Sequence, residues 1–267
     1  MNTNDPLILY GERFASRMML GTSRYPSPEI MLQCVKETQP AFLTVSLRRQ
    51  MPQQSSAEPQ GNAFWALLKE TQTPLLPNTA GCHSVREVIA TAQMAREVFE
   101  TDWIKLELIG DDYTLQPDTL ELPTAAKALI DLGFKVLPYC TEDLVLCQRL
   151  LDVGCQAVMP WAAPIGTGKG PINPYALQSL RDRLQVPLIV DAGLGVPSHA
   201  CQVMEWGFDG VLLNTAVALA QNPLGMANAF SQAVQAGRMA YLSGAMQAQD
   251  KAQASTPLMG TPFWHQS

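Results

Sequence analysis

The run Pro187-Leu188-Ile189-Val190-Asp191 is apolar up to its final carboxylate, and the glycine turn Ala192-Gly193-Leu194-Gly195 follows it directly. Short apolar runs bounded by turn residues are typical of strands. Eight such runs occur along the chain, and an amphipathic stretch follows each of them. The predicted strands cover residues 18–22, 41–46, 74–77, 103–109, 134–139, 156–160, 187–191 and 209–214. Their starts lie about 27 residues apart, which is close to the length of one strand, one helix and two short loops.

Helix-start signals lie between these strands, at Ser27-Pro28-Glu29, Ser84 and Asn173-Pro174. Glycines suited to left-handed helix C-caps stand where a helix gives way to a strand: Gly133, Gly154 and Gly207. Strict alternation of strands and helices implies parallel strands. Eight units predict a closed (β/α)8 TIM barrel in preference to an open doubly wound sheet. We expect one catalytic domain at residues 1–246, including an N-terminal extension, and a polar, flexible tail at residues 247–267.

Composition excludes several classes of protein. The 267 residues are 47% hydrophobic and carry a formal net charge of −6, with a mean hydropathy of +0.01. These values argue against a disordered chain and against a nucleic-acid-binding protein. No apolar run approaches the ~20 residues that cross a bilayer, and the N-terminus lacks the features of a signal peptide. We therefore predict a cytoplasmic protein with neither a membrane nor nucleic acid as its partner.

Cysteines and histidines give no sign of a metal site. The six cysteines form no CxxC or CxxH pair, and the three histidines are widely scattered. We expect the cysteines to be reduced, buried and apolar in character. No metal and no cofactor is predicted.

The fourth predicted strand carries the clearest chemical signal. Ile104, Leu106 and Leu108 share one face of this strand, while Lys105 and Glu107 share the other. If the apolar face meets the helices, the lysine and the glutamate point into the barrel. Burial lowers the pKa of a lysine, which suits a neutral amine that attacks a carbonyl.

Asp191 ends the seventh strand and brings a second carboxylate to the same mouth, since barrel active sites lie at the carboxyl ends of the strands. One amine with two carboxylates is a set that can form an imine and move protons. The alternative is an ion pair that only fills the centre of the barrel.

Three short turns follow strands six, seven and eight, at residues 164–170, 191–195 and 214–216, and the first two of them contain glycines. Barrels commonly hold a phosphate with such loops, because glycine lets backbone N–H groups approach the oxygens. Each turn alone could be ordinary turn chemistry. Their occurrence after consecutive strands favours a phosphate site, and Lys169 is expected to be a solvated loop residue.

Five strand ends carry distinctive motifs. They are Leu76-Pro77-Asn78-Thr79-Ala80-Gly81, Lys105-Leu106-Glu107-Leu108-Ile109-Gly110, Met159-Pro160 with Pro164-Ile165-Gly166, Val190-Asp191-Ala192-Gly193-Leu194-Gly195, and Leu212-Leu213-Asn214-Thr215-Ala216. Together these motifs closely resemble bacterial thiazole synthase of thiamine biosynthesis, the ThiG family. The likeness runs from about Leu7 to Ala245. The family fold is a TIM barrel.

The resemblance implies that Lys105 forms an imine with 1-deoxy-D-xylulose 5-phosphate and that Glu107 and Asp191 serve as acid and base. It places the ligand contacts on these residues: Gly166, Ala192, Gly193, Asn214 and Thr215. It also implies that a thiocarboxylate on a small sulfur-carrier protein delivers sulfur, that dehydroglycine closes the ring, and that the enzyme is a homo-oligomer, with a homotetramer expected.

The chain departs from the family pattern at Trp161, where a small or aliphatic residue is usual and where the indole could narrow the mouth near the sugar. Residues 48–62 could form a lid or a plain surface insertion, and the tail beyond Gln247 is a candidate carrier-docking surface. Two other functions stay open: a class I aldolase-like lyase acting on a sugar phosphate, and a catalytically silent scaffold that docks a carrier protein.

Overall fold

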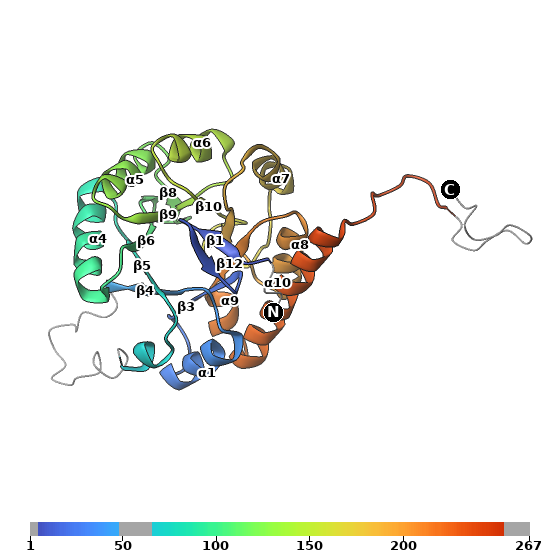
Figure 1. Ribbon diagram of the computed structural model, residues 1–267, viewed down its shortest axis with the longest axis horizontal. Coiled ribbons are helices and arrows are strands. Elements are labelled where there is room, and N and C mark those ends of the chain that lie inside the picture. The colour runs from blue at the N-terminus through green and yellow to red at the C-terminus, as the bar shows by residue number, and fades with distance from the viewer. Residues whose placement is uncertain (1–4, 48–65, 254–267) are drawn as a thin grey trace, which may run out of the picture.

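The computed structural model describes residues 5–47 and 66–253, and within them eight parallel strands form a ring with helices outside it (Figure 1). The ring is made of β3 (Met18–Gly21), β4 (Leu43–Ser46), β5 (Leu75–Asn78), β6 (Trp103–Leu106), β9 (Lys135–Cys140), β10 (Met159–Pro160), β11 (Ile189–Asp191) and β12 (Gly210–Leu213). The order around the sheet is β10-β9-β6-β5-β4-β3-β12-β11. A parallel bridge between Val158 and Leu188 joins its two ends. The predicted (β/α)8 barrel is confirmed.

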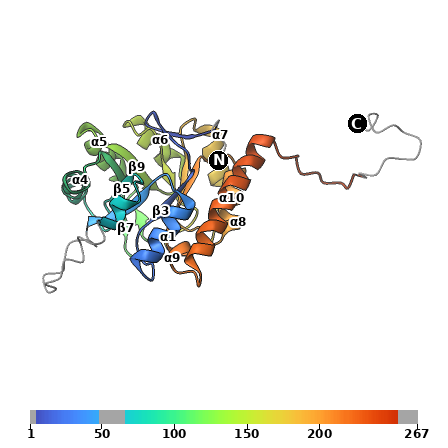
Figure 2. The same ribbon diagram turned by 60° about the horizontal axis from the view of Figure 1, so that its bottom comes forward.

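The outer layer follows the predicted helix signals. It contains α1 (Pro28–Thr38), α4 (Val85–Phe99), α5 (Leu122–Asp131), α6 (Leu144–Asp152), α7 (Pro174–Arg183), α8 (Pro197–Glu205), α9 (Thr215–Ala218) and α10 (Pro223–Ser243). Side chains of Ser27, Ser84 and Asn173 accept hydrogen bonds from the first turns of α1, α4 and α7, as expected of N-caps. The three predicted C-cap glycines have positive φ angles of 83°, 111° and 88°. The longest helix, α10, packs along α8 and α1 (Figure 2).

An N-terminal hairpin that the sequence pattern did not reveal closes one end of the barrel. Strands β1 (Leu7–Leu9) and β2 (Glu12–Phe14) pair antiparallel, and Leu7, Leu9 and Phe14 join the core inside the ring. The Phe14 ring packs 4.7 Å from that of Phe42 and 5.9 Å from that of Trp103, centre to centre. The hairpin therefore works as an apolar plug at the amino ends of the strands.

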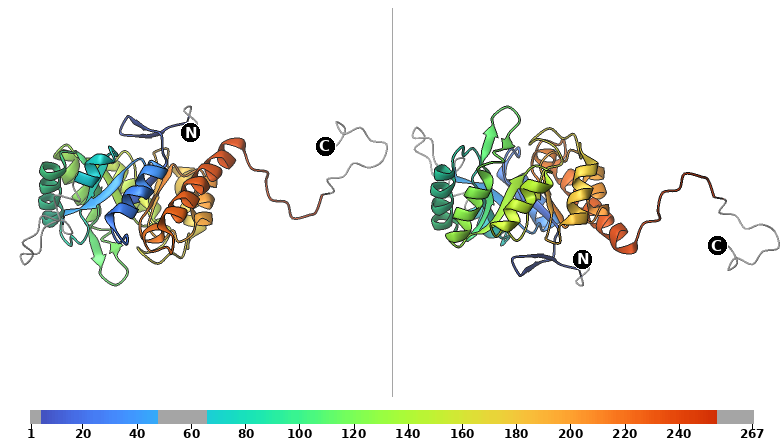
Figure 3. Two further views of the ribbon diagram at one scale, coloured as in Figure 1. Left: turned by 90° about the horizontal axis from the view of Figure 1, so that it is seen from below. Right: turned by 90° about the horizontal axis from the view of Figure 1, so that it is seen from above.

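The predicted strand 103–109 is wrong in its second half. β6 ends at Leu106, and β7 (Ile109–Asp111) belongs instead to a two-stranded antiparallel hairpin with β8 (Gln116–Pro117). A side chain replaces the sheet pairing beyond β6, because Glu107 N–H donates to Thr79 Oγ1 at 2.8 Å while that hydroxyl donates to Glu107 O at 2.7 Å. The β7–β8 hairpin projects from the end of the barrel opposite to the N-terminal plug (Figure 3).

The structure tests the predictions for the cysteines and, in part, those for the C-terminal tail. Five of the six cysteines are buried, Cys201 is half-buried, and all six are unbridged, as expected. Residues 247–253 are exposed and have no helix or strand. Residues 48–65 and 254–267, which include the whole predicted lid and most of the predicted tail, lie outside the described residues. Among the helices described, none is long and apolar enough to span a membrane.

If the N-terminal hairpin is a structural plug, Leu9→Ala should destabilise the whole barrel. Leu9 is fully buried in the interior core, so we expect a loss of about 2–4 kcal/mol in the free energy of unfolding. Ile8→Ala is the matched control, because Ile8 is 49% exposed on the other face of the same strand, and it should change this quantity by less than about 1 kcal/mol. Urea denaturation measures the free energy of unfolding of both variants. Equal losses in the two variants would show that the hairpin is not a structural plug.

Candidate active site

Three charged side chains meet inside the barrel at the carboxyl ends of its strands. Lys105 lies near the end of β6, Glu107 directly after it, and Asp191 ends β11, which β9 and β10 separate from β6 around the ring. Lys105 Nζ lies 2.6 Å from Asp191 Oδ2 and 3.2 Å from Glu107 Oε1. Lys105 is 5% exposed, Asp191 2% and Glu107 6%. The structure thus brings together all three residues predicted to be catalytic.

Strand alternation explains the inward direction of Lys105. Ile104 and Leu106, the neighbours of Lys105 in β6, pack in the core between the strands and the helices, as predicted, so Lys105 faces the interior. Leu108, beyond the end of the strand, packs in the same core. On the interior side, Trp103 belongs to the core that surrounds the N-terminal plug.

The electrostatics of the cluster differ from the prediction for Lys105. Burial by itself lowers the pKa of this lysine, but the charges and hydrogen bonds of Asp191 and Glu107 outweigh burial and raise its pKa above the ordinary value. The lowering that burial alone predicts is thus reversed, because the two carboxylates favour the protonated form of Nζ. Burial also raises the pKa of Asp191, with Lys105 opposing this shift and Glu107 adding to it.

Tyr139 and Trp161 extend the cluster toward the rim. The Lys105 ammonium lies 5.7 Å from the centre of the Tyr139 ring, and the Trp161 ring packs edge-on against Tyr139 at 6.4 Å. Sequence reasoning passed over Tyr139. Period-two alternation could have found it, since Leu137, two residues earlier in β9, faces the same interior.

The turns after β10 and β11 are locked together by backbone contacts. Ala192 and Gly193 have positive φ angles of 74° and 79°, and their carbonyls accept hydrogen bonds from Ala162 N–H at 3.2 Å and Gly170 N–H at 2.8 Å. A Cβ on Gly193 would overlap the backbone of Ala163, so only glycine fits there. Gly166 also has a positive φ, of 78°, and nothing lies near the position of its missing side chain.

Asn214 and Thr215 lie at the carboxyl end of β12, which is adjacent to β11 in the sheet. Asn214 Nδ2 donates to Ser23 Oγ at 2.6 Å, while its buried Oδ1 has no hydrogen-bond partner among the described residues. Gly21 leaves room for this side chain, because a Cβ at that position would overlap it. The five predicted substrate-binding residues thus stand at the ends of three neighbouring strands, whereas Lys169 is exposed in its loop.

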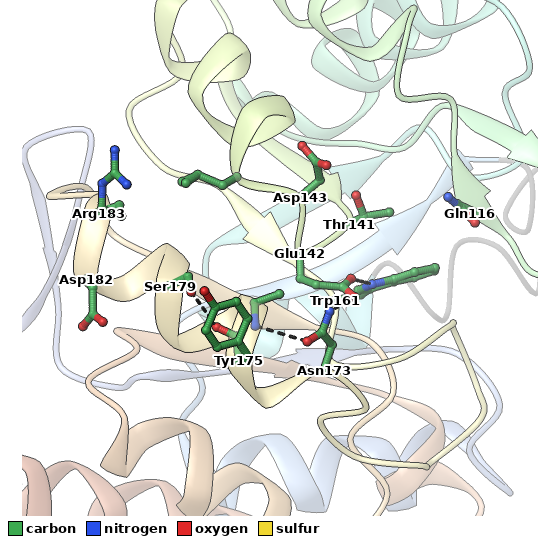
Figure 4. A pocket seen from close by; sticks show the side chains of 12 residues that line it. Gln116, Thr141, Glu142, Asp143, Trp161, Asn173, Tyr175, Ser179, Asp182 and Arg183 are labelled. Atoms are coloured by element: carbon green, nitrogen blue, oxygen red, sulfur yellow. Dashed lines mark hydrogen bonds between the residues drawn. The ribbon is translucent and has the colours of Figure 1, made fainter.

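An open cavity of about 620 Å³ borders the mouth beside β9 and β10 (Figure 4). Residues from the β9–α6 segment, from α7 and from the start of the β10–α7 loop line it. Glu142 is central to its wall, because one carboxylate oxygen accepts the indole N–H of Trp161 and the other accepts Asn173 Nδ2 at 3.3 Å. Sequence reasoning did not single out Glu142. In the part of the chain described, no group of three His, Cys, Asp or Glu side chains is arranged to hold a metal ion.

The family match and the sequence relatives of this chain agree on one family. Residues 8–257 match the family described as thiazole biosynthesis protein ThiG. The chain is 72% identical to the thiazole synthase of Variovorax paradoxus, over 98% of this chain and 96% of that protein, and 70% identical to that of Paracidovorax citrulli, over 98% and 97%. A crystal structure of an Amycolatopsis orientalis BexX/CysO complex contains a chain with 26% identity and a TM-score of 0.80, covering 92% of this chain and 100% of that one.

Because Lys105 compensates two buried carboxylates, Lys105→Met should destabilise the protein in a pH-dependent way. The raised pKa of Lys105 means that its contribution is fully present below the pKa of a free lysine and is lost as pH rises through the raised value. Without the ammonium, the pKa of Asp191 rises further, so the variant loses stability as pH rises from 5 to 8. We expect a deficit of about 3–5 kcal/mol at pH 8 and a smaller one at pH 5.

Urea denaturation of both proteins at the two pH values measures this deficit. Lys127→Met is the control, because the Lys127–Asp131 pair is exposed, and its loss should change stability by less than about 1 kcal/mol at either pH. A deficit for Lys105→Met that is the same at pH 5 and pH 8 would show that charge compensation is not its source.

Proposed function

This chain belongs to the family of thiazole biosynthesis protein ThiG, and we propose that it builds the thiazole phosphate of thiamine through an imine between Lys105 and 1-deoxy-D-xylulose 5-phosphate. As a thiazole synthase it needs a nucleophile and proton carriers at one place. The observation that carries the proposal is the Lys105 amine, held within 3.2 Å of two carboxylates at the barrel mouth. Catalytic roles therefore fall on Lys105, Glu107 and Asp191.

The first step is loss of a proton from Lys105, because only the neutral amine attacks a carbonyl. Asp191 is the nearest acceptor, at 2.6 Å, and its raised pKa makes it a better proton acceptor than an exposed aspartate. The transfer replaces a buried ion pair by a neutral pair. The amine nitrogen then adds to the ketone carbon, and the carbinolamine loses water to leave the C=N bond.

The imine acidifies the neighbouring C–H bond, so a carboxylate beside it can take that proton and return it to an adjacent carbon. Glu107 and Asp191 flank the amine from two different strands and can share this work. The carbonyl thereby moves along the sugar. The sulfur of a carrier-protein thiocarboxylate then replaces the moved carbonyl oxygen, and the carrier leaves as its carboxylate with that oxygen. The nitrogen of dehydroglycine displaces the Lys105 amine, its carbon closes the ring on the sulfur, and loss of water gives the carboxylated thiazole phosphate.

We assign the phosphate to the turns after β10, β11 and β12. Positive φ angles at Gly166, Ala192 and Gly193 expose backbone that can approach an anion, and Thr215 begins a helix, where N–H groups have no partner within the helix. The unpaired Oδ1 of Asn214 is available to a sugar hydroxyl. Anchoring the phosphate keeps the reacting carbons of a flexible substrate close to the amine.

A protein partner and self-association complete the proposal. The similarity to a chain from a BexX/CysO complex supports a sulfur-carrier protein at this barrel. The carboxyl-terminal turns of α10 expose Met239, Tyr241 and Leu242 by 61%, 45% and 53%, which suits the contact between copies that a homotetramer requires. We place the enzyme in the cytoplasm, with residues 1–246 as one catalytic domain and residues 247–267 as a tail.

Borohydride reduction in the presence of 1-deoxy-D-xylulose 5-phosphate should trap a stable adduct on Lys105. Reduction converts the imine to an amine that survives peptide mass mapping, so the modified residue can be identified directly. Lys169→Ala, which removes an exposed loop lysine, should trap normally, whereas Lys105→Ala should not trap at all.

An adduct on Lys169, or none, would overturn the imine role of Lys105. Release of a shorter carbonyl fragment from the pentulose phosphate alone would indicate the aldolase-like reaction instead. If Lys105→Ala kept full thiazole formation, the chain would act only as a scaffold for the carrier.

Gly193→Ala should weaken binding of the sugar phosphate, because a Cβ there would displace the backbone of Ala163 and distort the proposed phosphate site. We expect the KM for the pentulose phosphate to rise by roughly tenfold or more, in line with about 1–3 kcal/mol of backbone strain at the site. Gly11→Ala is the matched control. Gly11 has the same φ of 79° but no atom near its missing Cβ, so the control carries the same local strain far from the mouth. Equal changes in KM for Gly193→Ala and Gly11→Ala would show that the phosphate binds at another place.

A further inference from the structure

Trp161 is held at the rim of the barrel by three contacts, one from its backbone and two from its indole. Its backbone N–H donates to Cys140 O at 3.0 Å, its ring packs edge-on against Tyr139, and its indole N–H donates to the carboxylate of Glu142. The residue is only 7% exposed. A large ring held in this way is part of a wall, because it has no freedom to swing without breaking these contacts.

Glu142 has no described cation as its ion-pair partner, and both of its oxygens accept from side chains of the β10–α7 segment. The second donor, Asn173, is itself fixed, because its Oδ1 accepts the Ala176 N–H at 3.2 Å as the cap of α7. The carboxylate therefore ties the position of the indole to the start of a helix. A group that binds two fixed donors is suited to holding a neighbouring side chain in one orientation.

Trp161 stands between the open cavity and the reactive amine. The ring lines the cavity of about 620 Å³, beside Glu142 and Asn173 (Figure 4). On its inner side it contacts Tyr139, whose ring centre lies 5.7 Å from Lys105 Nζ. Two aromatic rings thus separate the cavity from the ammonium, and the outer ring is the one that faces the cavity.

We propose that Trp161 is a specificity-determining residue, which limits the size of the carbonyl compound that reaches Lys105, and that Glu142 is its positioning residue. The proposal rests on the imine role of Lys105. It adds that the indole, held by Glu142, narrows the route that leads from the cavity past Tyr139 to Lys105. Small carbonyl compounds then reach the amine, and compounds with a bulky ring are excluded. Removing the indole, or releasing it, widens the passage.

Reductive labelling of Lys105 by two aldehydes of different size tests this directly. The full-length protein and its variants are incubated with cyanoborohydride and either acetaldehyde or benzaldehyde, and the rate of modification of Lys105 is followed by peptide mass spectrometry. The measured quantity is the ratio of the benzaldehyde rate to the acetaldehyde rate. Any general change in the reactivity of the amine cancels in this ratio.

Trp161→Ala should raise the ratio roughly tenfold, the order of discrimination that a pocket gives between ligands of different size. Glu142→Ala should raise it roughly fivefold, the factor that corresponds to one ordinary hydrogen bond. Glu142→Gln keeps an acceptor for the indole and should restore most of the wild-type ratio. Adding Glu142→Ala to Trp161→Ala should cause no further rise, because Glu142 acts through the indole.

Tyr175→Ala is the control, since Tyr175 lines the same cavity, is 83% exposed and does not take part in the Glu142 contacts. An unchanged ratio in Trp161→Ala, an equal rise in Tyr175→Ala, or a Lys105 that acetaldehyde never labels would each overturn the proposal. A ratio that shifts as expected while the pentulose phosphate is not trapped on Lys105 would support the role of Trp161 and overturn only the proposed function.

Discussion

A lysine buried inside a barrel keeps its proton only when opposite charge is buried with it, and this requirement governs the protein. Lys105 lies 2.6 Å from Asp191 and 3.2 Å from Glu107, although β9 and β10 separate the strands that carry the two acids. Loss of either ring closure or strand register would leave charge without a partner in a medium of low dielectric constant. The same proximity gives the proton on Lys105 a short path to Asp191.

The two ends of the barrel have different tasks. The N-terminal hairpin fills one end with Leu7, Leu9 and Phe14, so the interior beneath the charged cluster is apolar. At the other end the strands finish in polar residues and glycine turns, and the β7–β8 hairpin stands beside the mouth. The apolar plug thus excludes water from below the cluster, which strengthens the electrostatic interactions among its charged groups.

A protein with a net charge of −6 has no general positive field with which to attract a sugar phosphate. The proposed phosphate site depends on local backbone instead, at positions where Ala192 and Gly193 adopt positive φ angles. The indole of Trp161, held by Glu142, forms the wall on the side of the cavity. The proposed phosphate site and the proposed limit on the size of the carbonyl compound thus both lie in neighbouring turns at the carboxyl ends of the strands.

The sequence by itself determined the alternation of strands and helices, the caps of α1, α4 and α7, and the inward face of Lys105, because periodicity and capping are local properties of the chain. Most of the proposed site residues could also be predicted, since the ends of barrel strands converge on one face. Only the tertiary structure decided the rest. It placed Leu7 and Leu9 as a plug, and it ended β6 early, where Thr79 bonds the backbone of Glu107. It also raised the pKa of Lys105 and fixed Trp161 against Glu142. These features depend on contacts between segments separated in sequence, and no local pattern specifies such contacts.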